Sequence, residues 1–354
     1  RLWKQSSGLI ARSVTQNAGD HGEHYITRDK KEYWAMFYSA AGGGVLIALM
    51  ALFKTYLGSI IDDKVWKGLA EGLNYGFGFM VIFMLHFTVA TKQPAMTAAR
   101  FAEAVEKNPQ GKTLNMKLAQ LLVDVFRSQS VAVLGNVVVA MGLAALIAFV
   151  YQHQTGEPLM NSENIAYQLH RIDPLDGSLW FAAIAGVWLF CSGIISGYFD
   201  NRSNYLNMRM RLAQHPLLKK LMSEKSRVKF ANYMHENYGS LIGNFCFGML
   251  LGLTGLVGYL THLPLDIRHV AFSSANLGYS AVSGQFAYPF FLQCIAFVLL
   301  IGLVNLMVSF SLTLWVALRS LNTEIDSWWA IWHEVCQIVR KRPLSLFFPV
   351  QLDK

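Results

Sequence analysis

The stretch PFFLQCIAFVLLIGLVNLMVSFSLTLWVAL, residues 289–318, decides the fold class of this chain. It runs for thirty residues without one Asp, Glu, Lys or Arg. A helix of about 20 apolar residues is already long enough to cross the roughly 30 Å hydrocarbon core of a bilayer. Because only helices and closed barrels satisfy their backbone hydrogen bonds in lipid, this stretch predicts a transmembrane helix.

Five further uncharged segments of similar length precede this one. The composition agrees with them, since 53% of the residues are hydrophobic and 15% are charged, whereas soluble domains carry about 25% charge. The sequence therefore predicts an all-α, polytopic helical membrane protein. We expect six transmembrane helices, at about 34–53, 72–91, 130–151, 178–199, 241–260 and 289–318.

The basic residues alternate between the connections of these spans. Of the 30 Lys and Arg residues, 25 lie in segments 1–33, 92–129, 200–240 and 319–354. Because basic connections stay in the cytoplasm, both termini are expected there, with the chain in a bacterial inner (plasma) membrane. The expected organisation is a cytoplasmic segment 1–33, a transmembrane domain 34–318 and a cytoplasmic amphipathic segment 319–354.

A weak internal repeat favours an arrangement of three helical hairpins. The stretches VFRSQSVAVLGNVVVAMG (125–142) and YMHENYGSLIGNFCFGML (233–250) align at a shift of 108 residues, which places Gly135-Asn136 on Gly243-Asn244. Each stretch is followed by a span end, a Pro-Leu pair and the next span.

Apolar stripes at helical spacing occur in the basic connections, at 114–125, 206–221 and 321–336. They predict cytoplasmic amphipathic helices, which either lie on the membrane or pack against a partner or a soluble domain. Membrane lipids are the expected partners, and the sequence does not indicate an oligomeric state. The basic residues expected at lipid headgroups are Arg202, Arg209, Arg211, Lys219 and Lys220.

Few polar side chains fall inside the expected spans. The candidates are His86, Asn136, Asn244 and Asn305, and no carboxylate accompanies them, which argues against a proton-coupled transporter. His86 lies near the cytoplasmic end of its span, so we expect an interfacial position. The asparagines are expected to bridge helices, and the glycines of 252–258 are expected to permit close helix packing.

The connection between the fifth and sixth spans concentrates polar residues in PLDIRHVAFSSANLGYS (264–280). We interpret it as a functional patch on the non-cytoplasmic side, either a polar clasp for the loop or the lip of an outward-facing pocket. Whether residues 270–288 re-enter the membrane stays open. The candidate residues are Asp266, Arg268, His269, Ser273, Asn276 and Tyr279.

No cofactor or metal site is expected. The stretch DHGEH at 20–24 offers two histidines three residues apart without an evident third ligand, and a solvated loop is the better interpretation. No catalytic residue is assigned, because no phosphate-binding glycine loop or nucleophile-elbow motif occurs in the sequence.

Two stretches carry a resemblance to a known family. Residues 264–280, together with GYFDNRSNYLNMRMRLAQHPLL (197–218), resemble a bacterial membrane protein family labelled "site-specific recombinase" (Gcr-type). The resemblance covers the whole chain. It implies a C-terminal membrane region whose parent protein has a soluble region before Arg1, and it implies DNA recombination as the family's labelled function.

The residues present do not match recombinase chemistry. A tyrosine recombinase uses an H-x-x-R box, and none of the ten histidines is followed by Arg at the third position. A serine recombinase needs a soluble catalytic domain. We therefore expect a non-enzymatic inner-membrane protein with a structural, lipid-handling or transport role, and DNA is not an expected partner of this chain. The alternatives are site-specific recombination, as the label states, and an outer-face membrane enzyme that uses 264–280.

Overall fold

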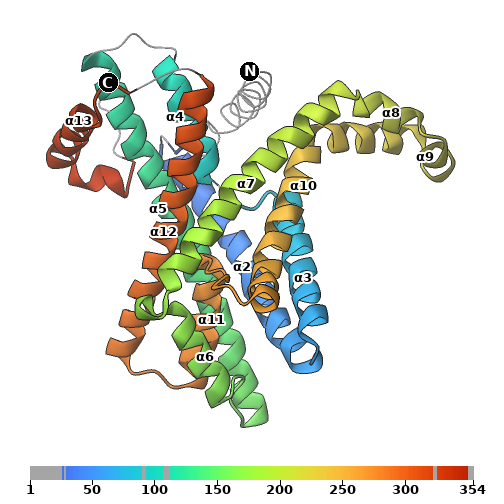
Figure 1. The fold of residues 1–354 in the computed structure, drawn as a ribbon, viewed down its shortest axis with the longest axis vertical. Coiled ribbons are helices and arrows are strands. Elements are labelled where there is room, and N and C mark those ends of the chain that lie inside the picture. Colours follow the sequence, from blue (N-terminus) through green and yellow to red (C-terminus); the bar gives the residue numbers. More distant parts are fainter. Residues whose placement is uncertain (1–25, 28, 90–92, 107–111, 322–324, 350–354) are drawn as a thin grey trace.

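The computed structural model describes residues 26–27, 29–89, 93–106, 112–321 and 325–349, and throughout these ranges the regular structure is helical. No strand occurs among them, which confirms the expected all-α membrane fold (Figure 1). The stretch DHGEH at 20–24 lies outside the described residues.

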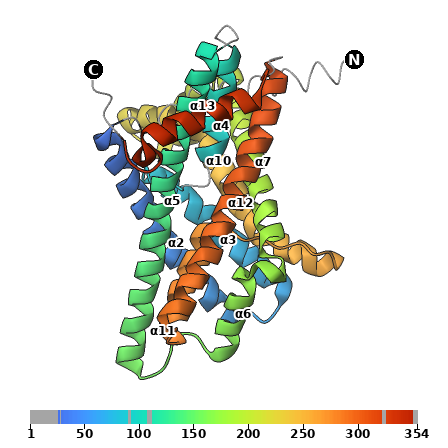
Figure 2. The same ribbon diagram turned by 90° about the vertical axis from the view of Figure 1, so that its left-hand side faces the viewer.

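Long helices run side by side along the longest axis of the molecule, and shorter ones join their ends (Figure 2). The elements are α2 (Lys30–Ile60), α3 (Lys64–Met84), α4 (Gln93–Glu106), α5 (Lys112–Thr155), α6 (Ser162–Ile172), η3 (Pro174–Asp176), α7 (Ser178–Tyr205), α8 (Met208–Gln214), α9 (Pro216–Leu221), α10 (Glu224–Thr261), α11 (Val270–Ser283), α12 (Tyr288–Ser320), α13 (Trp328–Lys341) and η4 (Pro343–Leu346).

Five of these helices are long and apolar enough to cross a membrane, namely α2, α5 from Leu114 onward, α7, α10 and α12. They correspond to five of the six expected spans. The sixth expected span, 72–91, falls on α3, which is not among the five. The count of six therefore stays a prediction.

The position of α3 differs from the expected span for two local reasons. Asp63 caps its N-terminus by accepting hydrogen bonds from the backbone N–H groups of Val65 and Trp66, so the helix begins at Lys64 rather than at 72. It ends at Met84, because the chain turns through a left-handed conformation at His86, where φ is 57°. His86 thus lies in an exposed turn beyond the end of the helix.

Among the described residues, only the first of the three expected hairpins packs as a hairpin. Helix α2 contacts α3, whereas α5 and α7, and likewise α10 and α12, share at most marginal contact. The main contacts instead join α10 to α3 and to α7, α2 to α5, and α12 to α7. Helix α11 lies against α5, α12 and α2.

Glycines bring α3 and α10 into backbone contact, as the small-residue stripe of 252–258 leads one to expect. A Cβ added to Gly252 would lie 2.5 Å from the backbone nitrogen of Gly72, and one added to Gly248 would collide with the backbone at Tyr75 and Gly76. No side chain larger than hydrogen fits at these two positions, so the two helices meet along their main chains.

The repeated Gly-Asn pair marks two equivalent helix crossings. Gly135 of α5 faces α2, where a Cβ would lie 2.8 Å from the carbonyl oxygen of Phe37. Gly243 of α10 faces α7, where a Cβ would lie 3.0 Å from the carbonyl oxygen of Ser192. The repeat is therefore a shared packing device, although the helices that it serves are not hairpin partners.

Two of the three amphipathic stripes differ in detail from expectation. The stripe in 114–125 is the first part of the single long helix α5, and Leu114 and Leu118 are buried in a core with α4, α12 and α13. The stripe in 321–336 has a different phase. Helix α13 buries Ile331 and Val335 and leaves Trp329 exposed, because Ser327 caps a helix that begins only at Trp328.

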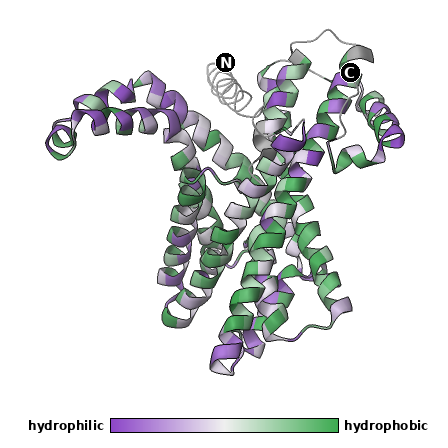
Figure 3. Cartoon of the chain, turned by 180° about the vertical axis from the view of Figure 1, so that it is seen from behind, coloured by the Kyte–Doolittle hydropathy of each residue, from purple (hydrophilic) through white to green (hydrophobic). Residues whose placement is uncertain are grey.

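The third stripe, 206–221, belongs to an arm that leaves the bundle. The arm consists of the C-terminal part of α7, the short helices α8 and α9 and the N-terminal part of α10 (Figure 1). Pro216 begins α9 and separates it from α8, as expected for a proline in a helical stripe. Figure 3 shows the arm as largely hydrophilic, in contrast to the hydrophobic bundle.

Candidate functional site

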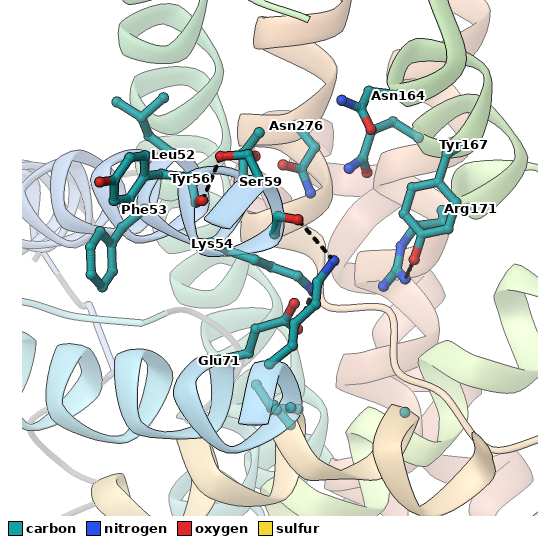
Figure 4. Close-up of a pocket in the computed structure, with 18 of the residues that line it drawn as sticks. Leu52, Phe53, Lys54, Tyr56, Ser59, Glu71, Asn164, Tyr167, Arg171 and Asn276 are labelled. Atoms are coloured by element: carbon teal, nitrogen blue, oxygen red, sulfur yellow. Dashed lines mark hydrogen bonds and ion pairs between the residues drawn. The ribbon is translucent and has the colours of Figure 1, made fainter. Parts of the chain in front are cut away.

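A cavity of about 1180 Å³ lies between the ends of α2, α3, α5, α6 and α10 and the segment that leads into α11 (Figure 4). Its walls come from the three connections that carry few basic residues, 54–71, 152–177 and 261–288, together with the adjoining ends of the helices. The low number of basic residues predicts the non-cytoplasmic side for these connections.

The lining of the cavity combines apolar and polar surfaces. The aliphatic and phenylalanine side chains are Leu49, Leu52, Phe53, Ile147, Leu159, Leu251, Leu256, Leu265 and Ile267. Uncharged hydrogen-bonding side chains line it as well, among them Tyr56, Asn164, Tyr167, Gln168 and Asn276. In Figure 4, Asn164, Tyr167 and Arg171 come from α6, and Asn276 comes from α11.

Positive charge exceeds negative charge in this lining. The cations are Lys54, Lys64, Lys67 and Arg171, and the anions are Glu71 and Asp266. Lys54 is 3.1 Å from Glu71 and Arg171 is 3.1 Å from Asp266, so these four charges form two ion pairs.

The other two lysines have weaker partners. The Lys64 ammonium lies 4.0 Å from the centre of the Tyr259 ring, and the Lys67 ammonium donates a long hydrogen bond of 3.5 Å to the Gly58 carbonyl oxygen. Neither lysine has a carboxylate within ion-pair distance among the described residues. Each therefore keeps donor capacity for a bound anion.

Asp266 stands at the centre of an Arg–Asp–Arg cluster. One carboxylate oxygen accepts hydrogen bonds from Arg171 at 3.1 Å and from Arg268 at 2.6 Å. Arg171 also donates to the Tyr167 hydroxyl and to the Ile267 carbonyl, and Arg268 donates back to the Arg171 carbonyl at 2.7 Å. The cluster fastens the segment before α11 to α6.

The electrostatics keep this cluster ionised. Burial alone would raise the pKa of the Asp266 carboxyl, but the guanidinium groups of Arg171 and Arg268 lower that pKa to about 2. The charge of Arg171 also lowers the pKa of the Tyr167 hydroxyl. At neutral pH the cluster carries one negative and two positive charges, which adds to the positive balance of the cavity.

The structure separates the six candidate residues of 264–280. Asp266 and Asn276 line the cavity, whereas Arg268, His269, Ser273 and Tyr279 are buried behind it.

His269 and Tyr279 have structural surroundings. The His269 ring is enclosed by the rings of Phe79, Phe247 and Phe272, with centroids 5.8 to 6.2 Å away, and the Tyr279 hydroxyl donates to the Ala48 carbonyl. Because His269 is buried, its side chain is not accessible to a substrate at the outer face.

Segment 270–288 begins with a buried helix. Most residues of α11 are buried, and the helix packs against α5, α12 and α2. Its 14 residues span about 21 Å, too short for a full crossing of the bilayer. The Val270 backbone N–H donates to the Asn305 side chain at 3.1 Å, so a residue from inside α12 caps the start of α11.

Asn305 and Asn136 bridge separate elements of the fold. Asn305 also donates to the carbonyls of Ala182 and Arg268, at 2.7 and 2.9 Å. Asn136 donates to the Ala40 and Thr88 carbonyls, which ties α5 to α2 and to the chain after α3. Asn244 donates to the Ser240 carbonyl within its own helix.

Sequence reasoning missed most of the cavity. Lys54, Lys64, Lys67 and Glu71 lie on helix ends that were assigned to a connection. One signal was available, because Arg171 and Arg268 are the lone basic residues of their two connections. These two isolated arginines both donate hydrogen bonds to the Asp266 carboxylate.

Other candidate residues lie away from the cavity. Arg202, Arg209, Arg211, Lys219 and Lys220 are exposed on the arm. No group of three or more potential metal ligands occurs among the described residues.

Comparison with known proteins gives one result. A family model described as "Site-specific recombinase" matches residues 1–349. No curated protein matches the chain, and no solved structure matches it.

Proposed function

This chain belongs to the site-specific recombinase family, and we propose, from its cavity, that it is a lipid-handling membrane protein that binds an anionic membrane lipid. The single observation that carries the proposal is the combination, in one cavity, of an apolar wall with an excess of positive charge. An anionic phospholipid has the same two-part chemistry, with acyl chains for the wall and a phosphate for the cations.

The size and charge of the cavity support a lipid rather than a small polar solute. Pockets for drug-sized ligands measure about 300–1,000 Å³, and this cavity, at about 1180 Å³, accepts a headgroup with part of its acyl chains. Opposite charges 4 Å apart attract by about 4 kcal/mol at the effective dielectric constant of a protein surface. Lys64 and Lys67 are the cations best placed to contact the phosphate, because neither is held by a carboxylate.

We further propose that the chain lies in a bacterial inner membrane with both termini in the cytoplasm; the alternation of basic residues supports this orientation. The cavity then lies in the outer half of the membrane and would take lipid from the outer leaflet. Transport of that lipid across the membrane is not part of the proposal.

The family description suggests a second function, DNA recombination. Phosphodiester chemistry of that kind needs a nucleophile with cations that stabilise the pentavalent phosphorus. The sequence lacks the H-x-x-R box, and residues 264–280 are expected on the side of the membrane away from DNA. We therefore favour lipid binding for this chain.

Lipid retention tests the proposal. The full chain would be purified in a mild detergent from membranes rich in phosphatidylglycerol, and bound lipid would be counted by native mass spectrometry. The Lys64→Gln/Lys67→Gln variant should bind anionic lipid about thirtyfold more weakly, since each of the two basic contacts is worth about 1 kcal/mol. The matched control is Lys30→Gln/Lys31→Gln, which removes the same charge from exposed positions at the start of α2, far from the cavity.

The control variant should retain anionic lipid as the natural chain does. Equal retention by the cavity variant and the control would show the proposal to be wrong. Loss of zwitterionic and anionic lipid alike from the cavity variant would also contradict it, because the argument rests on charge.

A further inference from the structure

We propose that the arm docks onto the anionic surface of the membrane that holds the bundle, and that its tip enters the headgroup layer. This site is separate from the cavity. It consists of residues 200–238, which include the C-terminal end of α7 and the N-terminal end of α10.

The arm is a built element with its own internal contacts. At its base, the Gly239 backbone N–H donates to the Asp200 carboxylate at 2.9 Å, and the Ser203 hydroxyl lies 3.1 Å from the His235 ring. Near the tip, Arg227 donates to the Ala213 carbonyl at 2.7 Å, which joins α10 to the end of α8. These bonds hold α7 and α10 together beyond the bundle.

The arm carries a strong positive charge. Between 200 and 238 it has eight basic residues and three acidic ones. The ion pair of Arg209 with Glu236 has a length of 3.5 Å and is exposed, so it neutralises little of this charge. The exposed basic residues are Arg202, Arg209, Arg211, Lys219, Lys220, Lys225 and Lys229.

The tip adds exposed apolar side chains to this charge. In α9, Leu217 is 61% exposed and Leu221 is 78% exposed. Because they are four residues apart on a helix, they lie on one face. Lys219 and Lys220 lie between these two leucines in the sequence, and both lysines are exposed as well.

Apolar and basic residues together are the pattern of a membrane-surface helix. Stable attachment to a bilayer takes two signals, apolar insertion and attraction to anionic lipid. A nucleic acid would use the lysines, but its phosphate backbone would not use two exposed leucines. The tip therefore matches an anionic bilayer better than DNA.

The direction of the arm agrees with this occupant. In Figure 1, α5 and α12 run close to the vertical, α7 rises obliquely, and the arm continues to one side, beyond α3. An arm that runs across the direction of the spans lies along the membrane surface. Figure 3 shows that the residues change from mostly hydrophobic to mostly hydrophilic where the arm leaves the bundle.

Contact quenching in vesicles tests the proposal on the full chain. The four cysteines are free, so they would be replaced by serine, and a fluorophore would be attached to the Leu221→Cys variant. The vesicles would contain phospholipids with brominated acyl chains, which quench only on contact. We expect quenching when about one third of the lipid is phosphatidylglycerol, and much weaker quenching in phosphatidylcholine alone or in high salt.

Two charge variants and DNA complete the experiment. Addition of Lys219→Gln/Lys220→Gln should lower the docking equilibrium roughly fivefold per lysine, whereas Lys30→Gln/Lys31→Gln should not. An unquenched label in anionic vesicles would overturn the proposal. Binding of duplex DNA by the detergent-solubilised protein, lost in Lys219→Gln/Lys220→Gln and accompanied by an unquenched label, would replace the membrane with DNA. Neither result depends on lipid retention in the cavity.

Discussion

Replacing Gly252 by alanine should destabilise the protein, because α3 and α10 have no room for a methyl group there. The added Cβ would lie 2.5 Å from the Gly72 backbone nitrogen and 3.0 Å from the Glu71 carbonyl carbon. Ordinary contacts of this kind are 3.4 to 4 Å long. Both neighbours are main-chain atoms, so the clash cannot be relieved by a side-chain rotation.

The expected cost is the difference between two opposing effects. Overpacking in a close-packed interior costs about 1–3 kcal/mol and occasionally more. Alanine regains about 1 kcal/mol over glycine in a helix interior. Since the added Cβ would meet main-chain atoms, we expect an overpacking cost at the upper end of the first range and a net loss of about 2 kcal/mol. The Gly252→Val variant should lose more.

Thermal unfolding of the detergent-purified protein measures this effect. Cys294 is buried and the other three cysteines are not, so in a Cys191→Ser/Cys246→Ser/Cys336→Ser background a thiol-reactive dye reports the loss of packing around α12 as the temperature rises. The Gly142→Ala variant is the matched control, because a Cβ at Gly142 meets nothing within 4 Å. Its Tm should stay equal or rise, whereas Gly252→Ala should unfold several degrees lower. Equal Tm values for the two variants would refute the close approach of α3 and α10.

Three further outcomes are expected from the same thermal assay. Asp266→Asn should cost about 1–2 kcal/mol at neutral pH, since the pKa of the carboxyl falls from 3.8 to about 2 on folding and its side chain is 29% exposed. Because the folded pKa lies below the unfolded one, this stabilisation is present above about pH 4 and is lost as the pH falls towards 2. Asp266→Asn should therefore lose less stability than the natural chain over that range, and an identical acid profile would count against the cluster. Asn305→Ala should cost about 2–3 kcal/mol by leaving buried backbone groups unpaired, whereas Thr313→Ala, which removes a hydroxyl that donates to the Ser309 carbonyl within α12, should cost less. Equal losses for the two variants would contradict the bridging role of Asn305.

The hydrophobic pattern predicted the fold class and most of the long helices, because a bilayer demands long uncharged helices whatever their packing. It failed at α3, whose start depends on one capping carboxylate at Asp63 and whose end depends on one left-handed residue at His86. Neither feature changes the average hydropathy. The order of packing was also beyond the pattern, since it depends on contacts such as those of Gly72 with Gly252, far apart in sequence.

The candidate site was predicted only in part, for a related reason. The polar residues of 264–280 stood out because they lie between apolar segments, and Asp266 and Asn276 do line the cavity. Lys64 and Lys67 did not stand out, because a lysine near a span end is ordinary on sequence grounds. Their importance follows from the absence of a nearby carboxylate among the described residues, which is a property of the folded chain.

Helix α10 is one continuous helix that connects the arm to the cavity. Its 38 residues run without interruption from the arm to the wall of the cavity, so a rigid tilt of α10 would pivot at its close glycine contact with α3. About 42 Å of helix lies on the arm side of Gly252 and about 14 Å on the cavity side, at 1.5 Å per residue. A tilt of about five degrees about Gly252 would displace the arm end of the helix by about 4 Å and its other end by about 1 Å. For such a tilt, the displacement at the cavity end of α10 is about one third of the displacement at its arm end.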